Sequence, residues 1–320
     1  FILKIVDHDA IDAVGHRVVH GGEYFKAATR ISPSVVKRVE SLNMLAPLHN
    51  PPNIAGIKAI TRHLPKVPQV AVFDTAFHQT IPPVAYMYGI PYVYYKKYGI
   101  RKYGFHGTSH KYIMQQTQKM LGKRSINMVS CHIGNGSSVC AIQNSKSIDT
   151  SMGFTPLPGI IMGTRSGDID PEIIGFLEEK EHLSTHELKA MLNKKSGLLG
   201  LTGSSDMRII HKRALQGDKK AELAIDILAY DIAQYVASYA GVIGNLDAIT
   251  FTAGLGEHAY YLREKVIRYF NCRNVRLDKR KNRNNELVIS TKDSVAKVLV
   301  IPTNEELMIA KETASVLKKR

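Results

Sequence analysis

The sequence predicts a globular α/β protein with two domains. Its 320 residues are more than one compact core usually holds. Hydrophobic residues make up 44% of the chain and charged residues 22%, a composition typical of globular proteins. Short apolar runs with the pattern of buried strands recur between longer stretches that have the apolar spacing of helices.

Charge and cysteine content limit the partners and the compartment. The 43 Lys and Arg residues outnumber the 28 Asp and Glu residues, which gives a formal net charge of +15 and favours anionic partners. No nucleic-acid reading module accompanies this charge, and the densest basic run, residues 273–283, is expected to be a solvated loop, so nucleic acid is not a predicted partner. No apolar run is long enough to cross a bilayer, so no membrane partner is predicted either. Cys131, Cys140 and Cys272 are odd in number and lack metal spacing, which favours free thiols in the cytoplasm.

The first part of the chain carries one arginine of interest. The pattern predicts strands over residues 1–6 and at Val18 and Val19, and helices over 9–14, 34–45 and 53–63, with an extended proline turn over 47–52. Arg17 precedes the second strand, and two glycines follow it. An arginine at such a strand edge can bind an anion bidentately, although an isolated arginine is more often a surface salt-bridge residue.

A carboxylate and two histidines follow the next strand. Residues 67–73 form a buried strand that ends at Asp74, and ligands of α/β proteins lie at the carboxyl ends of parallel strands. Asp74 could equally cap a helix. His106 lies in a glycine-containing loop and His110 near the start of a helix to residue 121, so one of them is a functional candidate and the other a structural one.

Residues 128–142 are two apolar strands joined by Gly134, Asn135 and Gly136, here called the Gly-Asn-Gly turn. Asn-Gly is the strongest dipeptide signal for an ordinary hairpin. The glycines also allow positive φ, and successive N–H groups of such a turn can point at phosphate oxygens. Both interpretations stay open on these residues alone.

A long loop and several helices occupy the second half. Residues 149–168 contain too many glycines and prolines for regular structure and too many apolar residues for disorder, so an ordered active-site loop with Arg165 as anion ligand is expected. Helices are predicted over 171–179, over 184–193 behind a capping box, and over 219–239, with a small-residue loop over 197–208. The apolar stripe of the last helix is predicted to comprise Leu223, Ile227, Leu228, Ile232, Tyr235, Val236 and Tyr239.

The C-terminal part repeats the alternation of strand and helix. Residues 248–252 form a strand, 253–258 a glycine turn and the following residues a helix to 269, an order that suits nucleotide phosphates. Residues 297–301 form the last strand, and a helix follows to residue 319. Glu305, at the strand tip, can bind a hard cation such as Mg²⁺ or favour the helix dipole.

These stretches together resemble the acetate kinase (acetokinase) family of the sugar-kinase/Hsp70/actin superfamily. The matching motifs, in family order, are HRVVHGGE with Arg17, PLHNPPN, VFDTAFH with Asp74, YGFHGTSH with His106, HIGNGSS with His132, FTPLPGIIMGTRSGDIDP with Arg165, SSDMR with Asp206, FTAGLGEHA with Gly254 and IPTNEE with Glu305. The resemblance implies reversible transfer of the ATP γ-phosphoryl group to acetate, giving acetyl phosphate and ADP, in a cytoplasmic homodimer that uses Mg²⁺ or Mn²⁺.

The resemblance also implies a role for each matching residue. Asp74, His106 and Arg165 would be catalytic, with Asp74 more suited to orientation or metal contact than to proton transfer, because acetate is already ionised at neutral pH. Arg17 would bind the carboxylate, and Val19, Leu48 and Pro156 the acetate methyl group. The nucleotide would contact His132, Ile133, Gly134, Asn135, Gly136, Asp206, Met207, Arg208, Gly254, Leu255, Gly256, Glu257 and His258, and the metal Glu305.

Two departures from the family pattern leave alternatives open. The family opens with an Asn-x-Gly-Ser-Ser-Ser turn that has no match here, so an N-terminal segment is expected to be missing and the first domain to be incomplete. His258 stands where many members carry Asn. The expected fold is a two-domain sugar-kinase/Hsp70/actin-like fold with mixed sheets and an interdomain cleft, divided into residues 1–75 plus 305–320 and residues 76–304. One alternative is a propionate or butyrate kinase, because these kinases share most of the motifs. The other is a truncated nucleotide-binding remnant with little activity, which the missing turn suggests.

Overall fold

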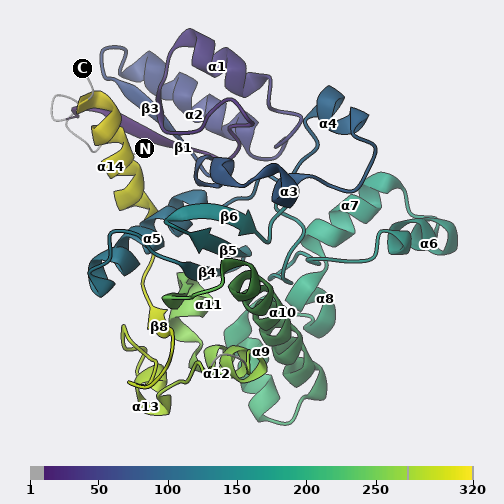
Figure 1. Cartoon of the computed structure of the whole chain (residues 1–320). Helices are drawn as coiled ribbons and strands as arrows, with labels where there is room; N and C mark the ends of the chain where they lie inside the picture. Colours follow the sequence, from purple (N-terminus) through teal and green to yellow (C-terminus); the bar gives the residue numbers. More distant parts are fainter. Residues whose placement is uncertain (1–10, 272–273, 319–320) are drawn as a thin grey trace.

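A computed structural model of the chain describes residues 11–271 and 274–318 and confirms a mixed α/β fold (Figure 1). Within these residues the strands form two sheets, one of three strands and one of five. The strand predicted over residues 1–6, Cys272 and the first residue of the basic run, Arg273, lie outside the described residues. The helix predicted over 9–14 is wrong in its described part, because residues 11–13 have no regular structure and a strand begins at Val14.

The first sheet places Arg17 and Asp74 at one edge. Strands β1 (Val14–Val18) and β3 (Gln69–Phe73) are parallel, and β2 (Thr29–Arg30) pairs antiparallel with β3. Helices α1 (Pro33–Glu40) and α2 (Asn50–His63) pack on each other, and α14 (Glu305–Lys318) packs against β1 and β3. Gly15 permits that packing, because a Cβ there would lie 2.5 Å from Thr313 Oγ1.

Two predicted boundaries in this part are wrong. Helix α1 ends at Glu40 rather than continuing to residue 45. Helix α2 begins at Asn50, inside the stretch predicted to be extended. Prolines are tolerated in the first turn of a helix, since the N–H groups there have no partner within the helix. Pro51 and Pro52 therefore begin the helix instead of preceding it.

The second sheet has the strand order β6-β5-β4-β7-β8. Strands β4 (Met128–Ile133), β5 (Ser137–Gln143) and β6 (Lys146–Thr150) are antiparallel neighbours, whereas β7 (Ala248–Thr252) and β8 (Lys297–Val300) run parallel to β4. The predicted hairpin is thus confirmed. In the parallel part, His132 pairs with Thr252, so the Gly-Asn-Gly turn and the segment after β7 meet at the same edge.

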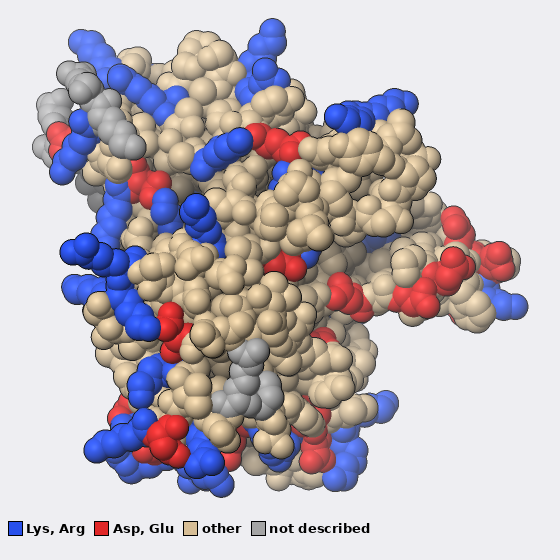
Figure 2. Space-filling view, viewed as in Figure 1, with Lys and Arg blue, Asp and Glu red and all other residues tan. Residues whose placement is uncertain are grey.

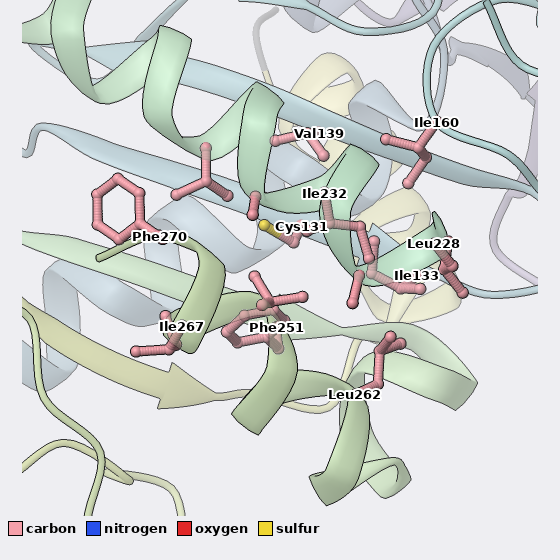
Figure 3. Close-up of a cluster of buried hydrophobic side chains, with 14 of the residues drawn as sticks. Cys131, Ile133, Val139, Ile160, Leu228, Ile232, Phe251, Leu262, Ile267 and Phe270 are labelled. Carbon is pink, nitrogen blue, oxygen red and sulfur yellow. The ribbon is translucent and has the colours of Figure 1, made fainter. Parts of the chain in front are cut away.

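The main core lies between this sheet and the helices that cover it. Figure 3 shows Leu228 and Ile232 of α10 (Lys219–Ile243) with Cys131 and Ile133 of β4 and Phe251 of β7. The predicted stripe is wrong at its start, because Leu223 is 57% exposed and the buried positions there are Ala221, Ala224 and Ile225.

The remaining elements are η3 (Ala76–Thr80), α3 (Pro83–Tyr86), α4 (Val93–Tyr98), α5 (Gly107–Leu121), α6 (Glu172–Glu181), α7 (Thr185–Lys194), α8 (Gly197–Thr202), α9 (Met207–Leu215), α11 (Ala253–His258), α12 (Tyr260–Tyr269) and α13 (Lys279–Arg283).

Three segments predicted as loops contain helix. Residues 197–208 form α8 and the start of α9, the glycine turn over 253–258 is the short helix α11, and part of the basic run is α13. In α8 and α11, tertiary packing overrides the low helix propensity of glycine. In α11, for example, a Cβ on Gly256 would lie 3.3 Å from the backbone of Phe251, so this helix packs directly against the end of β7. The capping box of α7, between Ser184 and Glu187, is confirmed.

Surface charge is spread widely over the face in Figure 2, where Lys and Arg side chains cover many elements. Acidic side chains gather on the protruding arm that contains α6 (Figure 2). Among the described residues, none of the helices has the combination of length and hydropathy required to cross a bilayer.

Candidate functional site

Arg17 and Asp74 form a bidentate ion pair at the carboxyl ends of β1 and β3. Arg17 Nε lies 3.0 Å from Asp74 Oδ2, and Arg17 Nη2 lies 2.7 Å from the same oxygen. Thr108 Oγ1 donates to Asp74 Oδ1 at 3.2 Å. Asp74 is 1% exposed, whereas the Arg17 side chain is 43% exposed. The negative charge of Asp74 raises the pKa of Arg17, and the buried carboxylate fixes the plane of the guanidinium group.

Glu305 lies beside this pair with an oxygen left free. Its Oε1 is 3.9 Å from Arg17 Nη2, and that oxygen is buried with no hydrogen-bond partner in the described part of the chain. Burial raises the pKa of Glu305, and the nearby charge of Asp74 adds to the increase while Arg17 opposes it. A buried carboxylate oxygen without a partner, close to a second carboxylate, suits a hard cation. Within the described residues no group of three or more His, Cys, Asp or Glu side chains has a metal-binding arrangement.

His106 lies between β3 and the Gly-Asn-Gly turn. It precedes α5 in the left-handed region, with a φ of 57°, and the following Gly107 N–H donates to Asp74 O at 2.9 Å. A non-glycine residue held at positive φ indicates a conformation that its surroundings impose. His106 Nδ1 lies 2.9 Å from Ser138 Oγ, and burial lowers the pKa of His106 well below its usual value, with the charges of His132, His110, Arg17 and Arg165 acting in the same direction.

Arg165 reaches the same place from the long loop, which has no regular structure between β6 and α6, as predicted. Its Nη1 donates to Pro156 O at 3.1 Å, and its main-chain oxygen accepts from Met162 N at 3.1 Å. Burial lowers the pKa of Arg165. The side chain therefore carries a desolvated positive charge, which attracts an anion more strongly than a hydrated one does.

The Gly-Asn-Gly turn approaches both of these groups. A Cβ placed on Gly136 would lie 3.4 Å from Arg165 Nη1 and 3.6 Å from His106 Nε2. The prediction of positive φ in this turn is wrong, because neither Gly134 nor Gly136 has one. The two strands close without positive φ at either glycine, and the missing side chain of Gly136 leaves a space beside Arg165 and His106.

A cavity of about 640 Å³ opens beside the turn and unites three predicted nucleotide segments. Its lining includes, from those segments, Gly134, Asn135, Asp206, Met207, Arg208, Gly254, Leu255 and His258. Asp206 also caps α9, where it accepts from Arg208 N at 2.9 Å and pairs with the Arg208 side chain. These segments are far apart in the sequence, so their convergence is a result of the fold. We call this space the nucleotide cavity.

Five residues predicted to contact nucleotide do not line this cavity, and one of them, Gly136, lies beside Arg165 and His106 instead. Ile133 is fully buried in the core, and Gly256 packs against the end of β7. Glu257 Oε1 accepts a hydrogen bond from Thr303 N at 3.1 Å. His132 is 7% exposed and stacks on His106 with ring centroids 4.2 Å apart. Ile133, Gly256, Glu257 and His132 therefore pack next to the residues that line the cavity, without lining it themselves.

The predicted methyl pocket is partly recognisable. Val19 packs against the buried side chains of Phe105, Met152 and Met162. The carbonyl group of Pro156 contacts Arg165, and Leu48 is 68% exposed.

The sequence reasoning missed several residues around the site. His211 and Tyr261 line the nucleotide cavity and stack with their ring centroids 3.5 Å apart. Burial lowers the pKa of His49, and the charges of Arg165 and Arg17 act in the same direction. The spacing of His211 and Tyr261 gave no signal, since they belong to different helices. His49 could have been found, because it stands in the quoted PLHNPPN motif.

Comparison with known proteins identifies what this chain is similar to. The acetokinase family is matched over residues 3–311. An acetate kinase from Carboxydothermus hydrogenoformans is 55% identical over 309 residues, which cover 95% of this chain and 78% of that protein. An acetate kinase from Thermotoga maritima is 54% identical over 323 residues, with 98% of this chain and 80% of that protein covered.

Solved structures of similar proteins agree with these sequence comparisons. A propionate kinase from Francisella tularensis superposes with a TM-score of 0.96 at 46% identity, over 99% of this chain and 82% of that one. An acetate kinase from Porphyromonas gingivalis gives a TM-score of 0.94 at 45% identity, over 97% of this chain and 79% of that one. The chain thus spans about four fifths of the length of these relatives.

Proposed function

The chain belongs to the acetokinase family, and on that premise we propose that its site transfers the γ-phosphoryl group of ATP to acetate, reversibly, giving acetyl phosphate and ADP. One observation carries the proposal: Arg165 Nη1 and His106 Nε2 both approach the Gly136 position, at 3.4 and 3.6 Å from where a Cβ would lie. Two donors from separate segments thus face one small space beside the nucleotide cavity. A transferring phosphoryl group requires that arrangement.

The charges at the site fit two anions reacting with each other. Carboxylate and triphosphate repel, and the equatorial oxygens of the transferring phosphoryl group carry charge in the transition state. Arg165 is desolvated and forms no ion pair with a carboxylate among the described residues, so its charge is available to stabilise the transition state. Arg17 is already oriented by Asp74 and binds the carboxylate of acetate with the exposed part of its guanidinium group. His106 donates a hydrogen bond to the phosphoryl group as a neutral ring.

ATP would lie in the nucleotide cavity with its phosphates directed to the Gly-Asn-Gly turn. The stacked rings of His211 and Tyr261 offer a flat apolar surface to a base. His258 lines the same cavity. In this proposal the contacts of His132, Ile133, Gly256 and Glu257 with nucleotide are indirect.

A magnesium ion fits beside Glu305 and Asp74. Glu305 Oε1, which is buried and has no hydrogen-bond partner among the described residues, would hold the ion. When bound, the ion neutralises part of the phosphate charge. Activity that is independent of added Mg²⁺ or Mn²⁺ after chelation would contradict this part.

Acetate is the proposed acceptor, and propionate is the second candidate because a propionate kinase is among the similar structures. Val19 packs against Phe105, Met152 and Met162, so little space is left for a longer acyl chain. One extra methylene changes binding by only about 1–3 kcal/mol, so the preference is graded rather than absolute.

We also propose a cytoplasmic homodimer and the two-domain division given above. The two sheets fall on either side of that division, with α14 returning to the first. For the dimer, the support is apolar surface on the protruding α6, where Ile173, Ile174 and Phe176 are 44%, 37% and 60% exposed. A second copy covering these side chains would remove them from water. A sedimentation experiment that returns only monomer would contradict the dimer.

The direct test traps the product. The purified chain is incubated with ATP, Mg²⁺ and acetate, and acetyl phosphate is converted to its hydroxamate with hydroxylamine. We expect hydroxamate to accumulate with acetate, and more slowly with propionate at equal concentration. Nucleotide binding without hydroxamate would favour the nucleotide-binding remnant, and faster turnover of propionate would favour the second candidate.

A further inference from the structure

Behind His106 a chain of hydrogen bonds runs into the core of the second sheet. His106 Nδ1 lies 2.9 Å from Ser138 Oγ, and the same oxygen lies 2.9 Å from His110 Nε2. His110 Nδ1 in turn lies 2.9 Å from Ser130 Oγ. Ser130, Ser138 and His110 are all 0% exposed. These hydrogen bonds therefore connect His106 Nδ1, the ring nitrogen that faces away from the reacting groups, to three side chains that water does not reach.

Counting protons leaves two arrangements. The single hydroxyl hydrogen of Ser138 goes either to His106 or to His110, and the other ring must then donate to Ser138 Oγ. In the first arrangement Ser130 donates to His110 Nδ1, His110 Nε2–H donates to Ser138, and Ser138 donates to His106 Nδ1. In the second arrangement every donor is reversed, so that His110 Nδ1–H donates to Ser130.

The Ser130 hydroxyl decides between them. Among the described residues it makes no hydrogen bond except the one to His110 Nδ1. In the second arrangement that bond uses Ser130 as acceptor, so its own hydrogen would be buried without an acceptor. In the first arrangement every hydroxyl and ring hydrogen between Ser130 and His106 has an acceptor. Buried donors without partners are strongly disfavoured, so the first arrangement is the stable one.

We propose that Ser130, His110 and Ser138 are positioning residues that hold His106 in the tautomer with its proton on Nε2. This inference rests on the proposed function, since Nε2 is the nitrogen that approaches the Gly136 position. A neutral imidazole offers one donor only, and which nitrogen carries it is set by the bond that the other nitrogen makes. With Nδ1 accepting from Ser138, the single proton is directed at the phosphoryl group.

The surroundings keep this ring neutral, so the tautomer matters. His110 and His132 face His106 from α5 and β4, and Arg17 and Arg165 face it from β1 and the long loop. All of these groups, together with burial, lower the pKa of His106. An imidazolium ring would donate from both nitrogens whatever Ser138 did, whereas the neutral ring depends on Ser138 to choose.

The first test reads the tautomer without any turnover. Chain labelled with ¹⁵N-histidine is examined by NMR at neutral pH in the absence of substrates, and signals are assigned by their loss in His106→Asn and His110→Asn. We expect pyrrole-type Nε2 and pyridine-type Nδ1 signals for both rings. A protonated Nδ1 on His106 would overturn the proposal, even in an enzyme that makes acetyl phosphate normally. The outcome is therefore independent of the proposed function.

The second test removes the Ser138 hydroxyl, which donates to His106 Nδ1 in the first arrangement. Ser138→Ala should lower kcat about tenfold to a hundredfold, as expected for one misdirected hydrogen bond to a charged transition state, while the KM values for ATP and acetate stay within about threefold. In this variant the Nδ1 and Nε2 signals of His106 should show a mixture of tautomers. The matched control is Ser147→Ala, which removes another buried hydroxyl bonded to a histidine, His78 Nδ1 at 2.8 Å. We expect kcat within about twofold of wild type for the control. An unchanged kcat in Ser138→Ala would contradict the proposal.

Discussion

Replacing Gly136 by alanine tests whether the space between Arg165 and His106 is where the phosphoryl group moves. The backbone allows the change, because the φ of Gly136 lies outside the left-handed region. The added methyl group would lie 3.4 Å from Arg165 Nη1 and 3.6 Å from His106 Nε2, which are ordinary contacts. Folding should therefore be unaffected.

The reaction should be affected strongly. A phosphoryl oxygen has to lie about 2.7–3.1 Å from its donors, so the methyl group and the oxygen compete for the same space. Removing one such donor contact typically costs about 10²–10³ in kcat, and two are disturbed here. We expect kcat to fall by at least about 10², or ~2.7 kcal/mol in activation free energy.

The assay is hydroxamate formation at saturating ATP and acetate, with the melting temperature recorded alongside. The control is Gly241→Ala on α10, where a Cβ would have nothing within 4 Å. It should keep wild-type kcat and gain about 0.5–1 kcal/mol of stability from higher helix propensity. A Gly136→Ala variant with kcat within about threefold of wild type would refute the placement of the phosphoryl group.

Three further predictions concern acetate, acyl choice and pH. Arg17→Ala should raise the KM for acetate at least about tenfold, since the carboxylate loses a charged bidentate partner, and an unchanged KM would exclude that contact. Val19→Ala should shift the kcat/KM ratio towards propionate by up to roughly tenfold, or about 1.4 kcal/mol, and a constant ratio would exclude Val19 from the pocket. Burial lowers the pKa of His20 and of His78 to about 4. The unfolded chain therefore binds more protons than the folded chain between about pH 6.5 and 4. Urea denaturation should show that the free energy of unfolding falls as the pH is lowered through that range, by up to ~1.4 kcal/mol per pH unit for each histidine. A free energy of unfolding that does not change with pH would contradict this prediction.

Local patterns predicted the elements that carry strong periodicity or capping. The hairpin around the Gly-Asn-Gly turn, the strand before Asp74 and the capping box of α7 all appear as expected. Each is marked by a local pattern of residue types, namely a turn dipeptide, an apolar run or a capping box. Helices α8 and α11 were missed, because their glycines lower helix propensity and only packing against the sheet and α10 makes them helical.

For the site, too, the sequence identified individual residues but not the contacts between distant segments. Arg17, Asp74, His106 and Arg165 could be named from residue type and loop context, and the fold brings them together. The geometry among them could not be predicted, since it depends on contacts between segments far apart in the chain. The pairing of Arg17 with Asp74 spans 57 residues, and that of His106 with Ser138 spans 32. The stack of His211 on Tyr261 depends on the relation of α9 to α12, which no local pattern encodes.

Arg165→Ala tests the central claim most directly, namely that Arg165 acts on the moving phosphoryl group rather than on the bound nucleotide. The measurement compares kcat for acetyl phosphate formation with the Kd of Mg-ADP from calorimetry in the same variant. The claim predicts a fall in kcat of about 10² or more with Kd within about threefold of wild type, because the charge that Arg165 meets develops only during transfer. A kcat close to wild type, or a loss of ADP affinity as large as the loss of rate, would contradict it.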